Sequence, residues 1–591
     1  MGYYFDDSQS INAYEGTDPQ AIISSLAYRY MGQNLKHGLY YRAYTNNGIV
    51  RTTDYRYLVD FNNIFPDSKD KECVWAFTKF YSAGKSSFGW DINCFGPMVV
   101  YVNGEVAYKS DIFKERYSET STRVFMDVEE GWNDIRIQFK KTKAGFGGQF
   151  GTWIGKWDMY TLMPTKERDG QEGFVFTELV PDDYVPEFEI GMSEKDFDKK
   201  LYPVINWSDD EMKKGQLTRM FGTPNGQYAV GYTKVFADDI NNTTHKFTLD
   251  TKGETVVYIN KKEVFKTKGG KETFDATLPL GTYDVYVKCI CNGSDWGYTL
   301  ECDTVEFESA ARVKGTDDVW MYIGTFVNDF EFPFDTASDM LHIVGEPATY
   351  WRLDAPDTFV RPYNENTLFG RWNYPLGVTM YGLLHTAIAI GSEDIKNYIK
   401  DHVQLCIDTL EYALWDKEQY GGATSIHNLL TSIDSLDDCG SFASMMLEVN
   451  KYLGLRDVKK VADYVGDYIY NHQSRLEDGT FFRKEMMHHF HNMTMWADDL
   501  YMSVPFLVRY SQFTGDQKYL DDAANQFFGF KKRLFMPEEK IMSHVYDFKY
   551  DSKTNVPWGR GNGWVVFSMN SIHPNPERRL IVFHPPVPEC A

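Results

Sequence analysis

The chain changes its hydrophobic period once, near residue 345. From about residue 38 to 340, short runs rich in Val, Tyr, Phe and Thr alternate in polarity between Gly, Asn and Asp turns, a pattern typical of β-strands. After residue 345, apolar residues recur at i, i+3 and i+4, which is typical of α-helices. The sequence therefore predicts a β-rich N-terminal part followed by an all-α part.

The β-rich part contains a weak internal repeat. The stretch "VVYVNGEVAYKS" from Val99 corresponds to "VVYINKKEVFKT" from Val256, and each indicates a strand, an Asn-centred turn and a second strand. Further on, "GWNDIRI" from Gly131 parallels "GTYDVYV" from Gly281. The repeat predicts two tandem β-sandwich modules of the jelly-roll type, joined by the polar stretch near 163–185.

The all-α part is predicted to contain helices joined by short Gly- or Asp-containing loops, as in αα-hairpins. Together they indicate a toroid of helical hairpins. Another helix is expected near the N-terminus, where Pro19 suits a first helical turn. The expected helices lie at 18–35, 375–390, 395–415, 438–453, 456–471, 499–514 and 516–534, with a further one beginning near Gly563.

At 591 residues the chain is too long for one hydrophobic core. We expect four parts: an N-terminal helical segment at 1–37, a first β-sandwich at 38–165, a second at 166–340, and a helical domain at 341–591. Surface aromatics such as Trp153 or Trp157 could make a sandwich bind carbohydrate; a structural spacer is the alternative.

The formal net charge of −23 argues against nucleic acid as a partner, because phosphate binding needs clustered Lys and Arg. An anionic substrate would need a local Arg. The eight cysteines lack the spacing of a disulfide framework, so reduced thiols are expected. The N-terminus does not resemble a signal peptide, and no apolar run approaches the roughly 20 residues of a membrane span. These features predict a cytoplasmic protein with no membrane partner.

Four motifs occur in order in the helical part: "RWNYPLGVTMYGLL" from Arg371, "SLDDCGSFASMMLE" from Ser435, "MWADDLYMSVPFL" from Met495, and "WGRGNGWVV" from Trp558. Together they resemble the unsaturated glucuronyl and rhamnogalacturonyl hydrolases of glycoside hydrolase families 88 and 105, more closely family 105, over about 345–570. The resemblance implies an (α/α)6 barrel. It also implies removal of a 4,5-unsaturated uronic acid from the non-reducing end of lyase-generated oligosaccharides of the pectin or rhamnogalacturonan type.

The resemblance implies an unusual reaction, in which the double bond is hydrated. An aspartic acid protonates C4, and the same or a linked carboxylate takes a proton from the water that adds at C5. The resulting hemiketal opens and the leaving sugar departs. The usual two-carboxylate mechanism of retaining and inverting glycosidases therefore does not apply to this reaction. Protonating a vinyl ether needs an acid that keeps its proton near neutral pH. Its pKa must therefore be raised by burial or by a neighbouring like charge.

Two aspartates are expected to be catalytic. Asp498 occupies the family's Trp-x-Asp position and is predicted to be the acid/base, with helix capping as the alternative. Asp499 would point about 100° away on a helix and is interpreted as a helix-start residue. Asp437 fits the family's second carboxylate. Its neighbour Asp438 is the rival, and capping of the following helix is the alternative for either residue.

The substrate-binding residues are also predicted from the resemblance. An Arg fork matches a carboxylate or ring hydroxyls, and tryptophan rings can stack on sugar faces. For the histidine a structural role is the alternative, and for Trp372 and Tyr374 core packing is. The predicted set is Arg560, His544, Trp564, Trp558, Trp372, Tyr374 and Trp496.

No metal or other cofactor is expected. The segment "HHFH", with His488, His489 and His491, has no acidic or Cys partner at ligand spacing, and the resemblance implies no metal. The expected partner is the unsaturated oligosaccharide, with a homo-oligomer possible.

The barrel of this family needs twelve helices, yet only 27 residues follow Trp564, rich in proline and without helical period. The sequence therefore predicts an incomplete barrel. This expectation supports an alternative function, a non-catalytic carbohydrate-binding or scaffold protein. A third hypothesis is that the protein hydrolyses ordinary saturated glycosides.

Overall fold

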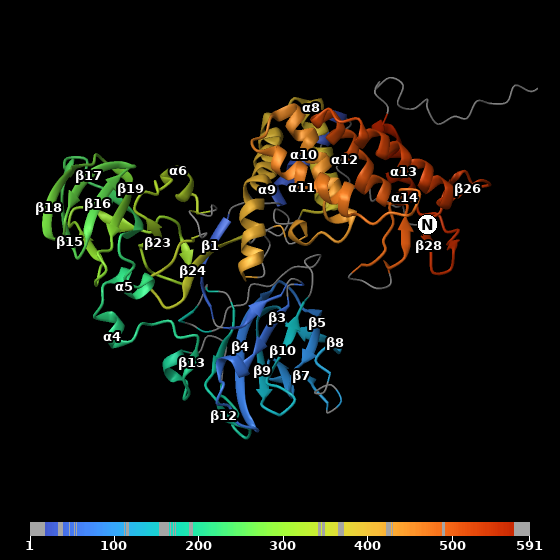
Figure 1. Ribbon diagram of the computed structural model, residues 1–591. Helices are drawn as coiled ribbons and strands as arrows, with labels where there is room; N and C mark the ends of the chain where they lie inside the picture. Colours follow the sequence, from blue (N-terminus) through green and yellow to red (C-terminus); the bar gives the residue numbers. More distant parts are fainter. Residues whose placement is uncertain are drawn as a thin grey trace, which may run out of the picture. The chain divides into compact units, whose positions relative to one another are not determined.

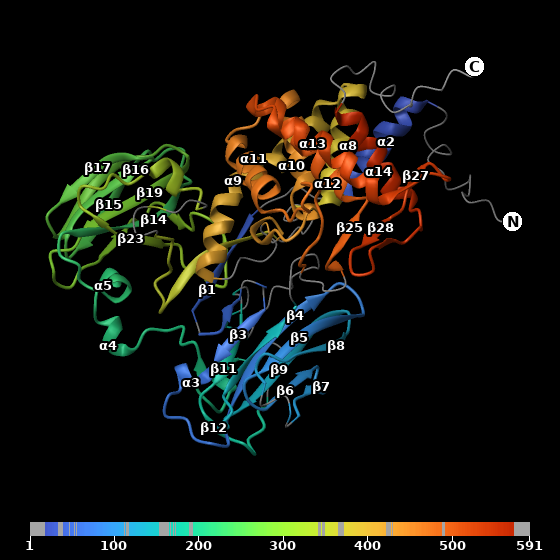
Figure 2. The ribbon, with the colours of Figure 1, turned by 45° about the vertical axis from the view of Figure 1, so that its right-hand side comes forward.

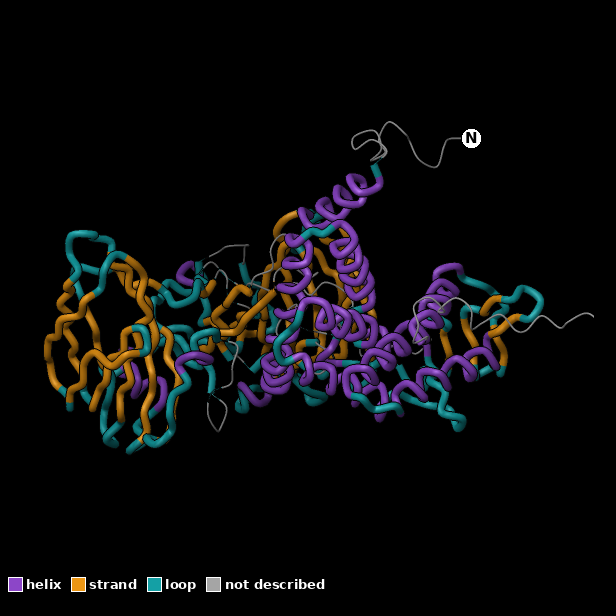
Figure 3. The backbone as a smooth tube through the Cα atoms, turned by 90° about the horizontal axis from the view of Figure 1, so that it is seen from above, coloured by secondary structure: helices purple, strands orange, loops and turns teal. Residues whose placement is uncertain are grey.

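The protein is seen here in a computed structural model, which divides it into two compact units (Figure 1). A helical unit comprises Met1–Gly38, Asn366–Ala413 and Ser425–Ala591, and a β-rich unit comprises Leu39–Glu365 and Leu414–Thr424. The structure describes residues 18–572, except 34–38, 47, 53, 55, 112, 114–116, 153–164, 166, 169–170, 172, 188–192, 341–343, 345–348, 365–371, 421–426, 428 and 487–490. Strands dominate the β-rich unit and helices dominate the helical unit (Figure 3).

The β-rich unit begins with two sheets that share one apolar core. One sheet has the order β2-β3-β10-β5-β8, and the other has β13-β11-β4-β9-β6-β7, with β12 also paired to β4. Aromatic side chains such as Phe61, Phe139 and Phe150 fill the space between them. The strands are β2 (Val50–Arg51), β3 (Tyr57–Asp60), β4 (Glu72–Ser82), β5 (Ser86–Cys94), β6 (Met98–Val102), β7 (Glu105–Lys109), β8 (Ser121–Val128), β9 (Gly131–Lys140), β10 (Gly147–Gly151), β11 (Val175–Thr177), β12 (Val180–Pro181) and β13 (Leu201–Tyr202).

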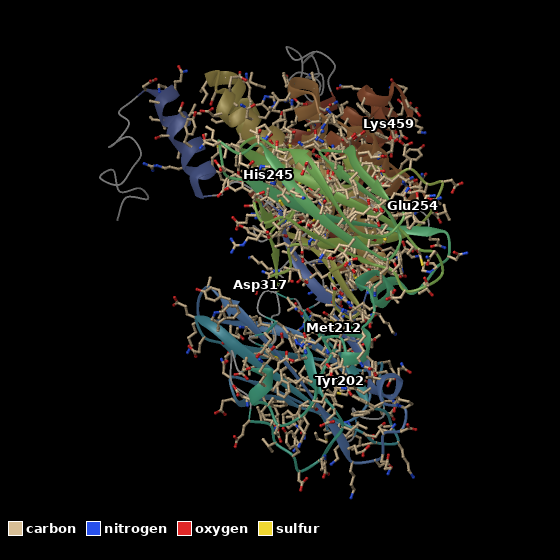
Figure 4. The ribbon with its side chains drawn as sticks, turned by 90° about the vertical axis from the view of Figure 1, so that its left-hand side faces the viewer. Tyr202, Met212, His245, Glu254, Asp317 and Lys459 are labelled. Atoms are coloured by element: carbon tan, nitrogen blue, oxygen red, sulfur yellow. The ribbon has the colours of Figure 1, made fainter. Side chains whose placement is uncertain are left out.

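A second pair of sheets follows, with the orders β17-β16-β19-β14-β21 and β18-β15-β20, and β23 also pairs with β14. Figure 4 shows this part with His245 on β15 and Glu254 on β16 labelled. The imidazole of His245 is buried and bonded to Thr304 and to the carbonyl of Leu278. The strands are β14 (Gln227–Ala237), β15 (Thr244–Thr251), β16 (Glu254–Ile259), β17 (Lys262–Thr267), β18 (Gly270–Thr277), β19 (Gly281–Ile290), β20 (Tyr298–Glu301), β21 (Glu306–Glu308) and β23 (Met321–Val327).

Short elements complete the β-rich unit. A three-stranded sheet of order β22-β1-β24 joins β1 (Leu39–Thr45) to β22 (Val313–Lys314) and β24 (Thr358–Asn364). One-turn helices lie between the strands: α3 (Phe61–Ile64), α4 (Asp209–Met212), α5 (Gln216–Phe221) and α6 (Phe334–Ala337), with a 3-10 turn at η2 (Glu194–Asp196).

The internal repeat has the same geometry in both sandwiches. Asn103 and Asn260 each lie at a positive φ, 50° and 46°, in the turn of a hairpin. Each side chain accepts a hydrogen bond from the backbone N–H of an aspartate on the neighbouring strand, Asp134 or Asp284, at 3.0 Å. Each asparagine N–H also donates back to the carbonyl of that aspartate. Asn tolerates this left-handed backbone, so the Asn-centred turns locate equivalent points of two related modules.

The predicted helices are present. They are α8 (Tyr374–Ile390), α9 (Glu393–Tyr420), α10 (Gly440–Leu453), α11 (Val458–Asp467), α12 (Asp499–Thr514), α13 (Lys518–Leu534) and α14 (Gly559–Ile572), preceded in the chain by α2 (Pro19–Gln33). They lie in the helical unit except for the end of α9 from Leu414 on. Helix α11 continues into a π-turn at η5 (Tyr468–His472), and 3-10 turns lie at η3 (Leu430–Ser432) and η4 (Leu436–Asp438). The last helix begins at Gly559, four residues before the predicted start.

Helices α10 and α12 lie inside this unit. Helix α10 packs against α8 and α12, and α12 packs against α13 and α14. Residues 499–508 of α12 are all buried, Pro505 included, which is typical of a helix surrounded by protein on all sides over that length. The closed (α/α)6 barrel stays a prediction, and the proline-rich end predicted to truncate it lies, from residue 573 on, outside the described residues.

Short strands are inserted among these helices, which the helical period did not predict. Figure 2 shows β25 and β28 side by side near α12 and α14. They are β25 (Thr494–Trp496), β28 (Val545–Asp547) and β29 (Ser552–Lys553) in one sheet, and β26 (Phe535–Met536) with β27 (Ile541–Met542) in another. Within the described part of the chain, none of the helices has the length and apolar character needed to cross a bilayer.

Asn260→Ala tests the turn that the two sandwiches share. The substitution removes a side-chain hydrogen bond and places alanine at a positive φ, so we expect a stability loss of about 1–2 kcal/mol. Asn103→Ala should cost a similar amount. Chemical denaturation followed by circular dichroism measures both, with the exposed Asn241→Ala as a control. Equal stability of Asn260→Ala and Asn241→Ala would show that the turn is not stabilised in this way.

Candidate active site

Asp498 lies between β25 and α12 and is 8% exposed. It stands at the position that precedes the first helical residue, but its side chain makes no hydrogen bond to the first turn of α12. A capping aspartate would accept such a bond. The capping alternative therefore does not describe Asp498, and its carboxyl group is available for other chemistry.

The neighbouring carboxylate, Asp499, is held by an arginine that the sequence analysis missed. Arg483 donates from Nε to Asp499 Oδ2 at 3.1 Å and from Nη2 to Asp499 Oδ1 at 2.6 Å. The same Nη2 lies 3.4 Å from Asp437 Oδ2. Although burial alone would lower the pKa of Arg483, these carboxylates raise it above its usual range. Asp499 does begin α12, as expected, but its side chain belongs to this buried ion pair.

The structure separates Asp437 from its rival Asp438. Asp438 Oδ2 accepts from the backbone N–H groups of Asp434 and Ser435, each at 3.2 Å, and closes a capping box with Ser435. Asp437 turns toward Arg483, and among the described residues its Oδ1 has no hydrogen-bond partner. Asp437 is therefore the member of the pair that joins the carboxylate cluster.

Burial raises the pKa of Asp498 to about 7, with further contributions from the charges of Asp499 and Asp437. His544 Nε2 lies 3.2 Å from Asp498 Oδ2, but no hydrogen bond is formed between them, and within the described part of the protein neither atom has a hydrogen-bond partner. Burial also lowers the pKa of His544, helped by Arg483 and Arg560. Near pH 7 a substantial fraction of Asp498 therefore still holds its proton, and the lowered pKa of His544 favours a neutral imidazole beside it.

Aromatic rings surround His544. Its ring centroid lies 4.8 Å from Trp496 and 4.5 Å from Trp558. The guanidinium of Arg560 lies 4.0 Å above the Trp558 ring, and Arg560 is exposed. No ion pair of Arg560 is found among the residues described, so its charge is available to an anion.

Gly561 brings the backbone of α14 next to the acid. A Cβ atom on this residue would lie 3.3 Å from Trp558, 3.4 Å from Asp498 Oδ2 and 3.7 Å from His544. A Cβ here would be tight against Trp558 and in ordinary van der Waals contact with Asp498 and His544. Gly561 of "WGRGNGW" thus lets the backbone approach these groups closely, a signal that the motif contained but that sequence reasoning did not use.

The other predicted aromatics lie elsewhere in the helical unit. Trp564 stacks on Tyr501, with centroids 4.5 Å apart, and so packs α14 against α12. Trp372 is fully buried, and its indole N–H donates to the carbonyl of Cys439 at 3.2 Å. A ring with no exposed face cannot stack on a sugar, so core packing, the alternative, describes Trp372. Tyr374 is half-buried at the start of α8.

The histidine-rich segment is only partly described. His488 and His489 lie outside the described residues, and the ring of His491 contacts Trp496 at 5.1 Å. The described residues contain no group of three or more His, Cys, Asp or Glu side chains placed to hold a metal ion.

Comparison with known proteins shows what this region is similar to. Residues 355–574 match the sequence profile described as Glycosyl Hydrolase Family 88. An unsaturated rhamnogalacturonyl hydrolase of Bacillus subtilis is 25% identical over 34% of this chain and 54% of its own length. An unsaturated 3S-rhamnoglycuronyl hydrolase of an Alteromonas species is 32% identical over 15% of this chain and 24% of its own. The chain thus spans about half the length of the first of these relatives.

A solved family 105 glycoside hydrolase of C. acetobutylicum is 22% identical, over 35% of this chain and 54% of that chain, with a TM-score of 0.28. A score this low supports no conclusion about the fold. The profile and the relatives show that residues 355–574 are similar to Glycosyl Hydrolase Family 88 and to unsaturated rhamnogalacturonyl and rhamnoglycuronyl hydrolases, the similarity that the four motifs predicted.

The raised pKa of Asp498 makes a prediction about stability. The unfolded aspartate has a pKa near 4, whereas the folded one titrates near pH 7, so the folded state binds more protons between these values. The protein should therefore lose stability, relative to Asp498→Asn, as pH rises from about 4 to about 7. Thermal unfolding of both proteins across this range measures the difference. A constant difference in Tm would contradict the raised pKa.

Proposed function

We propose that the chain hydrolyses oligosaccharides carrying a 4,5-unsaturated uronic acid at the non-reducing end, of the pectin or rhamnogalacturonan type. The observation that carries this proposal is Asp498, a buried carboxyl group whose pKa is raised to about 7 beside two further carboxylates. Hydration of a vinyl ether needs such an acid. The match of residues 355–574 to the family 88 profile supports the same substrate class.

In the proposed reaction, Asp498 gives its proton to C4 of the unsaturated sugar. Water adds at C5, and its proton passes to the carboxylate of Asp498, so the acid is regenerated and one water is consumed. The hemiketal at C5 then opens and the leaving sugar departs. His544, 3.2 Å from the carboxyl group, is proposed to help position the water. Asp437 keeps a second negative charge near the acid.

Arg560 is proposed to bind the carboxylate of the uronic acid. It is exposed and lies above the Trp558 ring, whereas the nearby Arg483 is already bonded to Asp499. The planar fork of an arginine suits a carboxylate. Trp558 and Trp496, which border His544, are proposed to contact the faces of the sugar ring.

Asp498→Asn tests the proposed function. The amide cannot donate an acidic proton, so turnover of a lyase-generated unsaturated disaccharide should fall about 10²- to 10⁴-fold. Loss of the ultraviolet absorbance of the double bond measures the rate. The exposed Asp521→Asn on α13 is the matched control and should keep the parent rate. Full activity of Asp498→Asn would disprove the assignment of the acid.

Arg560→Ala tests the binding of the carboxylate. Loss of a hydrogen bond to a charged group should raise KM about tenfold to hundredfold with a smaller effect on kcat. Kinetics on the same disaccharide give both constants, and Arg560→Lys should recover part of the affinity because it restores the charge. A KM unchanged in Arg560→Ala would assign the carboxylate to another group.

Binding of unsaturated disaccharides without turnover would support the alternative, a non-catalytic carbohydrate-binding or scaffold protein. Turnover of a saturated aryl glycoside would indicate an ordinary glycosidase instead. The four-part division at residues 37, 165 and 340, the (α/α)6 barrel and the cytoplasmic location are kept as predictions with this proposal.

A further inference from the structure

Three buried or half-buried carboxyl groups meet one buried guanidinium. The side chains of Arg483 and Asp499 are 7% and 3% exposed, and those of Asp437 and Asp498 are 20% and 12% exposed. Arg483 binds Asp499 through two parallel hydrogen bonds and contacts Asp437 at 3.4 Å. In the described part of the protein, no hydrogen bond or ion pair joins Arg483 to Asp498.

The charges in this cluster do not balance if all three acids are ionised. One positive charge faces three negative ones, and burial makes an uncompensated charge costly. A cation within hydrogen-bond distance favours the ionised form of its own partners. Asp499 and Asp437 are those partners. Burial raises the pKa of Asp499, and Arg483 opposes that rise through its charge and its hydrogen bonds. Asp498 has no hydrogen bond to the cation, so it is the group expected to keep a proton.

We propose that Arg483 is a positioning residue which, by binding Asp499 and Asp437, leaves Asp498 as the carboxyl group that holds the exchangeable proton of the site. This inference rests on the proposed function for its catalytic meaning. The effect of Arg483 on the protonation of Asp498 does not depend on any substrate. Arg483 touches no reacting atom in this scheme and acts through the two carboxylates that it binds.

The charged and titratable groups around Asp498 come from separate segments. Asp499 lies on α12, Asp437 on η4, and Arg483 in a segment bridged to Thr494 at the start of β25. His544 precedes β28, and Arg560 on α14 acts on the pKa of His544. His544 has a lowered pKa and so adds no positive charge near neutral pH. Arg560 is exposed and therefore screened by solvent. Arg483 is the buried cation of the cluster.

Opposite shifts in Arg483→Gln and Asp499→Asn test the proposal. Without the cation, the pKa values of the three acids should rise. The alkaline limb of the pH profile of kcat/KM should then move to a pH about one unit higher. Removing the carboxylate of Asp499 both deletes a like charge and frees Arg483, so the limb should move down by a similar amount. A purely structural ion pair would change stability in both variants and leave the limb in place.

A second Arg–Asp pair in the same unit provides the control. Arg475 also makes two parallel hydrogen bonds, to Asp522 on α13, at 2.9 and 2.8 Å. Arg475→Gln and Asp522→Asn should lower Tm without shifting the limb. Asp499→Asn keeps the side-chain volume and loses only one charge. If Arg483→Gln fails to fold, the shift of the alkaline limb in Asp499→Asn still tests the proposal.

A readout without substrate separates this inference from the proposed function. Each protein is compared with the same protein carrying Asp498→Asn, and the difference in Tm is followed against pH. The midpoint of that difference should rise in the Arg483→Gln background and fall in the Asp499→Asn background. Midpoints equal to that of the parent protein would overturn the role of Arg483. Shifted midpoints without turnover of unsaturated sugars would reject the proposed function alone.

Discussion

The site depends on a buried positive charge. Transfer of a guanidinium into the protein interior costs several kcal/mol unless its donors are satisfied, and Arg483 is satisfied by Asp499 at 2.6 and 3.1 Å and approached by Asp437 at 3.4 Å. These partners lie on α12 and η4, while Arg483 itself is bridged to Thr494. Arg483 therefore ties three segments of the helical unit to each other. Without the charge of its guanidinium, repulsion between the neighbouring carboxylates would oppose their burial side by side.

Short strands give the site its second constraint. In the sheet, Trp496 pairs with Val545, and one residue further the N–H of Ala497 donates to the carbonyl of His544 at 2.9 Å. This backbone bond sets the imidazole beside the residue that follows Ala497, which is Asp498. A helical hairpin alone would not fix the distance between the segment that carries Asp498 and the segment that carries His544. The sheet fixes their spacing, so the 3.2 Å contact between acid and imidazole follows from main-chain geometry.

Much of this could be predicted from sequence, because period and motif are local signals. The period of 3.6 located the helices from α8 to α13, and the Asn-centred turns located both sandwiches. Arg483 was not predictable in the same way, since "FFRKE" belongs to no motif and its partners are 16 and 46 residues away. Trp372 shows the converse error: a tryptophan in a family motif suggested a sugar contact, whereas the ring fills the core beneath Cys439. Burial of a single ring depends on tertiary packing that a motif does not encode.

Asp498 and Asp499 show how far local position determines chemistry. Both stand at the start of α12, where the helix dipole favours a negative charge, and both are buried. Local sequence would give them the same ionisation. A helix turns by about 100° per residue, so Asp499 faces Arg483 while Asp498 faces His544 and the backbone of Gly561. The dipole acts on both and cannot separate them, whereas, of these two aspartates, Arg483 forms hydrogen bonds with Asp499 alone. The proposed difference between a structural carboxylate and a proton donor therefore comes from the direction of the side chain, because of the two only Asp499 points toward the guanidinium of Arg483.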